Sequence, residues 1–127
     1  CAAASAAIDV VIEEKLPDRA AETGDFMMEH LRLMQEKHPL IGDVRGKGLF
    51  IGVELVKDEK TREKAVDEAA KVLKKSEEKG VLFGISSLVG VGNVIKIKPP
   101  LNITKDTATK ILDLFEEALS EVEKESL

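Results

Sequence analysis

The chain has 127 residues, of which 43% are hydrophobic and 34% charged, and its formal net charge is −5. This length is enough for one domain with a core. The mixed charges leave no basic patch for a nucleic acid, and the apolar runs are too short to span a membrane. The single cysteine, Cys1, excludes an internal disulfide and fits a reducing compartment. We therefore expect a cytoplasmic domain that binds neither nucleic acid nor membrane.

Two helices are predicted at the start of the chain. Strong helix formers with apolar residues at helical spacing run from Ala2 to about Lys15. Leu16-Pro17 interrupts them, and because proline suits the first turn of a helix, a second helix is expected over 17–37. The sequence His38-Pro39 ends this second helix. Its expected apolar face comprises Ala20, Gly24, Met27, Met28, Leu31 and Met34.

A strand is predicted over 49–56, where apolar residues alternate, and Ile41-Gly42-Asp43 is expected to lead into it. After a polar turn at 57–60, Thr61 is expected to cap a helix that ends near Lys79, with Gly80 as a left-handed C-terminal cap.

Residues 81–83 are predicted as a short strand, 84–92 as a glycine-rich loop and 94–98 as a further strand, which Pro99-Pro100 ends. Thr104 is expected to cap a last helix, whose end frays from Glu123 onward. The resulting fold class is α+β, with a small, mainly antiparallel sheet of three or four strands covered by helices.

Groups that could carry chemistry are few. His30 and His38 lie eight residues apart, not the four that would stack two metal ligands on a helix, so both are expected to be solvated or capping residues and no metal site is predicted. Lys96 is the one charged residue with a positional argument. It alternates with Ile95 and Ile97, so it should point away from the core, toward solvent or a neighbouring domain.

Two segments carry a family resemblance: VRGKGLFIGVE at 44–54 and NVIKIKPPL at 93–101. They resemble paired strands in the small C-terminal domain of class III (fold type I) pyridoxal-phosphate aminotransferases, in the alanine–glyoxylate and 4-aminobutyrate aminotransferase-like branch. The resemblance covers nearly the whole chain. It implies that residues 1–16 are an interdomain linker helix and that 17–127 are the small domain.

The resemblance also implies a function. The parent protein would be a homodimeric, cytoplasmic aminotransferase that moves an amino group from an amino donor to a 2-oxo acid, and this domain would close one side of the substrate cleft. Pyridoxal 5'-phosphate and its Schiff-base lysine would belong to a large domain outside this chain, so no catalytic or cofactor-binding residue is expected here. The chain alone should be inactive.

The resemblance assigns substrate binding to Lys96, because many members hold the substrate carboxylate with an arginine at this place. Lysine is a point charge rather than a planar fork, so the two are not equivalent. A phospholyase of the same family, in which a lysine faces a phosphate, is one alternative. Others are a free-standing α+β ligand-binding module and a purely structural interaction domain. Lys96 as an ordinary exposed strand lysine also stays open.

Overall fold

The computed structural model describes residues 1–88 and 90–126. In these residues the strands form one antiparallel sheet in the order β1-β2-β4-β3, which confirms the predicted α+β class and small antiparallel sheet. The elements in chain order are α1 (Ala2–Glu13), α2 (Leu16–Lys37), β1 (Ile41–Lys47), β2 (Phe50–Leu55), α3 (Val66–Glu78), β3 (Gly84–Ile85), β4 (Val94–Ile97) and α4 (Lys105–Ser126).

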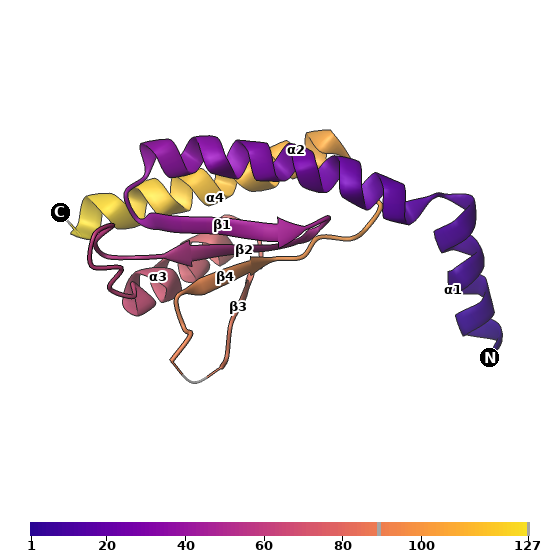
Figure 1. Cartoon of the computed structure of the whole chain (residues 1–127), viewed down its shortest axis with the longest axis horizontal. Coiled ribbons are helices and arrows are strands. Elements are labelled where there is room, and N and C mark those ends of the chain that lie inside the picture. The colour runs from indigo at the N-terminus through magenta and orange to yellow at the C-terminus, as the bar shows by residue number, and fades with distance from the viewer. Residues whose placement is uncertain (89, 127) are drawn as a thin grey trace.

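Helices α2, α3 and α4 pack on one face of the sheet, and α2 and α4 lie alongside each other (Figure 1). The alternate residues of the two central strands point into this layer and are at most 2% exposed: Ile51, Val53, Leu55, Ile95 and Ile97. The predicted apolar face of α2 is also buried throughout. The core therefore lies between the sheet and the helices, and the other face of the sheet stays open.

Helix α1 extends away from this core (Figure 1). All of its residues are exposed or half-exposed, including Ile8 at 58% and Ile12 at 68%. The chain bends at Lys15, whose φ of 49° is left-handed, and Pro17 lies in the first turn of α2 as predicted. The apolar side chains of α1 are thus not used by the core of this domain.

Several predicted boundaries are wrong. The segment 44–54 is not one strand, because β1 ends at Lys47 and turns back as β2, so 41–47 is a strand rather than a lead-in. A helix does not begin at Thr61: the Asp58 carboxylate accepts hydrogen bonds from the amides of Thr61 and, less strongly, Lys60, which makes a turn and lowers the Asp58 pKa. Helix α3 begins only at Val66.

Two corrections concern the sheet edge and the chain end. Residues 81–83 are not a strand, since the pairing with β4 falls on Gly84 and Ile85, inside the predicted loop. That loop also includes Val89, which lies outside the described residues. Helix α4 is capped by Thr104, whose hydroxyl accepts the Thr107 amide hydrogen, as expected, but it continues to Ser126 instead of fraying from Glu123.

None of the helices in the described part of the chain is both long and apolar enough to cross a bilayer.

The turn between β1 and β2 touches the backbone of α2. A Cβ on Gly24 would lie 2.1 Å from the carbonyl oxygen of Gly48, so only glycine permits this contact. Gly48 itself has a φ of 56°, a conformation that disfavours other residues. These two glycines let the hairpin lie directly on the helix.

We expect Gly24→Ala to lower the free energy of unfolding by about 2 kcal/mol, since the added methyl overpacks a backbone contact. Helix propensity alone predicts the opposite sign, a gain of about 1 kcal/mol. Chemical denaturation measures the change, and Asp25→Ala, at the exposed neighbouring position, is the control. A variant as stable as the wild type, or more stable, would contradict the close contact.

His38 and Glu123 connect the C-terminal end of α2 with the last turns of α4. His38 ends α2 as predicted, but its side chain is buried rather than solvated. Its Nδ1 lies 2.7 Å from a carboxylate oxygen of Glu123 and its Nε2 lies 3.2 Å from one of Glu116. The second Glu123 oxygen accepts the amide hydrogen of Leu40. These hydrogen bonds connect the residues just before β1 with α4.

We expect Glu123→Ala to cost about 1–3 kcal/mol of stability, because it leaves a buried imidazole nitrogen and a backbone N–H without their acceptor. Glu125→Ala is the matched control. Glu125 is a nearby exposed carboxylate, 2.7 Å from Lys75, and such pairs contribute at most about 1 kcal/mol. Equal losses in the two variants, measured by thermal or chemical unfolding, would mean that the cluster is only a surface feature.

Candidate functional site

The open face of the sheet carries the polar side chains of the strands in cross-strand rows. The central row follows from the strand register: Arg45 on β1 is opposite Gly52 on β2, and Gly52 is opposite Lys96 on β4. On its other side Lys96 is opposite Gly84 on β3. Because side chains alternate along a strand, this row faces away from the helices. Lys96 therefore points away from the core, as the alternation predicts.

Lys96 lines a pocket of about 400 Å³ on this face. The pocket also includes Arg45 and Gly52 from the same row, the exposed ring of Phe50, and Ser86 and Val91 from the segment between β3 and β4. Lys96 is half-buried and lines the pocket together with the cationic Arg45. The arrangement can bind a small ligand that carries an anionic group.

Lys98 is on the same side of the chain but in a different setting. Its ammonium nitrogen lies 5.6 Å from the centroid of the Phe50 ring, at the range of a cation–π contact. It borders a second hollow of about 430 Å³, near Pro17 and Leu101, rather than the pocket of Lys96. The two lysines that the sequence places on one face thus border different hollows.

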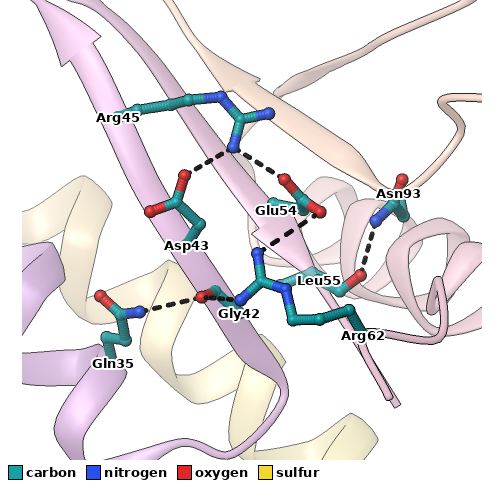
Figure 2. A network of polar contacts seen from close by, with 8 residues as sticks. All are labelled: Gln35, Gly42, Asp43, Arg45, Glu54, Leu55, Arg62 and Asn93. Carbon is teal, nitrogen blue, oxygen red and sulfur yellow. Dashed lines mark hydrogen bonds and ion pairs between the residues drawn. The ribbon is translucent and has the colours of Figure 1, made fainter. Parts of the chain in front are cut away.

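A network of charged side chains lies beside the pocket (Figure 2). Arg45 Nη1 donates hydrogen bonds to Asp43 and Glu54, each at 2.7 Å. Glu54 is also 3.8 Å from Nη2 of Arg62, whose Nη1 donates to the carbonyl oxygen of Gly42. The hydrogen bonds with Glu54 and then Asp43 raise the pKa of Arg45 above its ordinary value. Sequence reasoning missed this network, although the alternation of β1 and β2 could have placed Asp43, Arg45 and Glu54 together.

Asn93 fixes the start of β4 beside the pocket. It is buried, and its side-chain amide donates to the carbonyl oxygen of Leu55 at 2.8 Å (Figure 2). The Leu55 amide in turn donates to the Asn93 carbonyl. This double link holds β4 to β2 in the register that faces Lys96 outward.

These residues do not fit a complete site for pyridoxal phosphate. Such a site needs a lysine for covalent attachment and a carboxylate beside the pyridine nitrogen. The carboxylates near Lys96 on the open face are Asp43 and Glu54, and both already contact Arg45. None of the described residues that line the Lys96 pocket is a carboxylate, so the pyridine nitrogen would have no partner there.

Comparison with known proteins identifies the family. The chain matches the class-III aminotransferase family over residues 1–119. It belongs to this family. The match is to the small C-terminal domain, which confirms the resemblance seen in the sequence, and the members of this family are pyridoxal-phosphate-dependent enzymes.

Relatives of this class-III aminotransferase domain have several activities. The chain is 46% identical to a leucine/methionine racemase of Thermococcus litoralis, with 96% of the chain and 27% of the relative covered. It is 41% identical to an (R)-1-hydroxy-2-aminoethylphosphonate ammonia-lyase of Vibrio splendidus, with 98% and 25% covered. A solved amine transaminase from an uncultivated Pseudomonas species matches with a TM-score of 0.86 and 35% identity, over 96% of this chain and 27% of the other. The chain spans about a quarter of the length of these relatives.

Proposed function

We propose that this chain is part of a larger pyridoxal-phosphate-dependent aminotransferase, which transfers an amino group from an amino acid or amine to a 2-oxo acid. The observation that carries the proposal is the family match together with the Lys96 pocket on the open sheet face. Residues 1–16 act as the linker helix to the large domain, which is supported by the exposure of α1, and residues 17–127 form the small domain.

In this enzyme the open face closes one side of the substrate cleft, and Lys96 contacts the anionic group of the substrate. The half-burial of Lys96 in a pocket with Phe50 and Val91 supports this role, because a partly desolvated ammonium attracts an anion more strongly than a fully solvated one. The large domain holds the cofactor. We further propose that the enzyme is a homodimer and, from its single cysteine, cytoplasmic.

A racemase or an ammonia-lyase is a second candidate. Relatives named for those two reactions are 46% and 41% identical to this chain, which is above the 35% of the transaminase structure. The substrates in the names of these two relatives carry an anionic group, an amino-acid carboxylate or a phosphonate, so the Lys96 pocket would serve both reactions. The small domain alone therefore does not distinguish these reactions, and the products of the full-length enzyme must be identified.

One assay separates these reactions. The full-length protein, supplied with pyridoxal phosphate, is incubated with an amino donor and a 2-oxo acid. Transamination yields a second amino acid, racemisation yields the enantiomer of the donor without transfer, and lyase activity releases ammonia. A protein that consumes no amino donor, from a gene that encodes no large domain, would instead support the free-standing binding module.

We expect Lys96→Ala in the full-length enzyme to raise KM for an anionic substrate and to lower kcat/KM by about tenfold to a hundredfold. A charge-assisted hydrogen bond contributes about 1.5–3 kcal/mol, which gives that range. Steady-state kinetics with a carboxylate-bearing donor measure the change.

Lys98→Ala is the matched control, since Lys98 directly follows β4 and lies outside the pocket. It should leave KM within about twofold. If both variants lose the same efficiency, or neither loses any, the two lysines are only a solvated strand surface.

We also expect the 127-residue chain alone to bind no pyridoxal phosphate covalently and to transfer no amino group, because its residues do not complete a cofactor site. Absorbance spectroscopy and mass spectrometry after borohydride reduction test this directly. Stoichiometric attachment of the cofactor to one particular lysine would overturn the expectation, whereas random partial labelling of exposed lysines would not.

A further inference from the structure

The backbone at position 52 does not require glycine. A Cβ built there would lie 3.4 Å from Cγ1 of Val94 and 3.8 Å from the carbonyl oxygen of Arg45, both ordinary contacts. Gly24 differs, because its Cβ would lie 2.1 Å from a carbonyl oxygen. Glycine inside a strand costs about 0.5–1 kcal/mol relative to alanine. The reason for glycine at 52 therefore lies in the space above it.

That space is bordered by two cations. Gly52 is opposite Arg45 on one side and Lys96 on the other. Neighbouring strands are about 4.8 Å apart, so the two cationic residues stand about 10 Å apart at their Cα atoms, with no side chain between them in the row. Along β2 the same space lies between the exposed ring of Phe50 and the carboxylate of Glu54. It forms the floor of the Lys96 pocket.

Arg45 is held so that part of its guanidinium can still donate. Both of its hydrogen bonds to Asp43 and Glu54 use Nη1. Figure 2 shows that the other terminal nitrogen points away from these two carboxylates. Guanidinium carries five N–H donors in a fixed plane, so two carboxylates on one nitrogen leave the remaining N–H groups for a ligand. Arg45 can thus supply the planar donor edge that Lys96 lacks.

We propose that Arg45 and Gly52 are specificity-determining residues of the Lys96 pocket. The carboxylate or phosphoryl group of the substrate lies on the Gly52 floor, between the ammonium of Lys96 and the outward edge of Arg45. Two donors on opposite sides favour an anion with at least two terminal oxygens over an uncharged amine. This inference rests on the proposed function, because it assumes that the open face is the substrate side.

The test measures binding rather than turnover. Propionate and ethyl phosphate are the probes, because they carry the two candidate anions but no amino group to react. Their dissociation constants for the full-length, cofactor-loaded protein are measured by calorimetry in the wild type, in Arg45→Gln, and in Gly52→Ala and Gly52→Val. The anion that binds the wild type more tightly identifies the substrate group.

Two variants serve as controls. Lys98→Ala removes a cation that lies outside the pocket. Arg62→Gln removes the other cation that contacts Glu54, outside the pocket. Melting curves establish that each variant is folded. If Arg45→Gln does not fold, the Gly52 variants still test the floor, because an alanine there is accommodated by the backbone.

We expect Arg45→Gln and Gly52→Val to weaken binding of the preferred anion by about tenfold to a hundredfold, the range for one charge-assisted hydrogen bond. Gly52→Ala should have a smaller effect, and the two controls should stay within twofold. The inference is overturned if neither anion binds the wild type, if the Gly52 variants bind as the wild type does, or if the controls lose as much. Because no turnover is needed, a wild type that binds the anion but transfers no amino group would count against the proposed function alone.

Discussion

The pairing of β2 with β4 is the constraint on which both halves of this domain depend. Gly52 is opposite Lys96 and Val53 is opposite Ile95, so one register sends the isoleucines and valine to the helices and the lysine to the open face. A slip by one residue would exchange the two faces, burying Lys96 and exposing Ile95. Asn93 prevents such a slip, because its side chain and its carbonyl both bind the backbone of Leu55.

Two contacts with the helical layer position the sheet. At one end the backbone of Gly24 touches Gly48, so the β1–β2 hairpin can sit on α2 only at that point. At the other end His38 and Glu123 join the start of β1 to α4. Neither contact reaches the open face.

Much of this architecture could be predicted from the sequence wherever the relevant pattern is local. The buried face of α2 repeats every three or four residues, and the alternation around Ile95 and Ile97 placed Lys96 on the open face. Strand β1 was missed because a bulge at Gly42 puts its buried residues, Ile41 and Val44, three positions apart. A period of three breaks the alternation by which strands are found.

The remaining features depend on partners far away in the sequence. His38 lies 85 residues from Glu123 and 78 from Glu116, so nothing near it predicts burial. The role of Arg45 likewise needs the register of two strand pairs before it meets Gly52 and Lys96. The resemblance to the family supplied Lys96 as a candidate, but it assigned no role to Arg45 or Gly52, although both lie in the segment 44–54 that carries it.

The most direct test of the account is a crystal structure of the full-length protein with its cofactor and a non-reacting carboxylate or phosphate analogue of the substrate. We expect the analogue's anionic group to lie on the open sheet face, about 3 Å from Nζ of Lys96 and above Gly52. An open face covered by another part of the protein, with Lys96 paired to a carboxylate from that part and the analogue bound elsewhere, would contradict it.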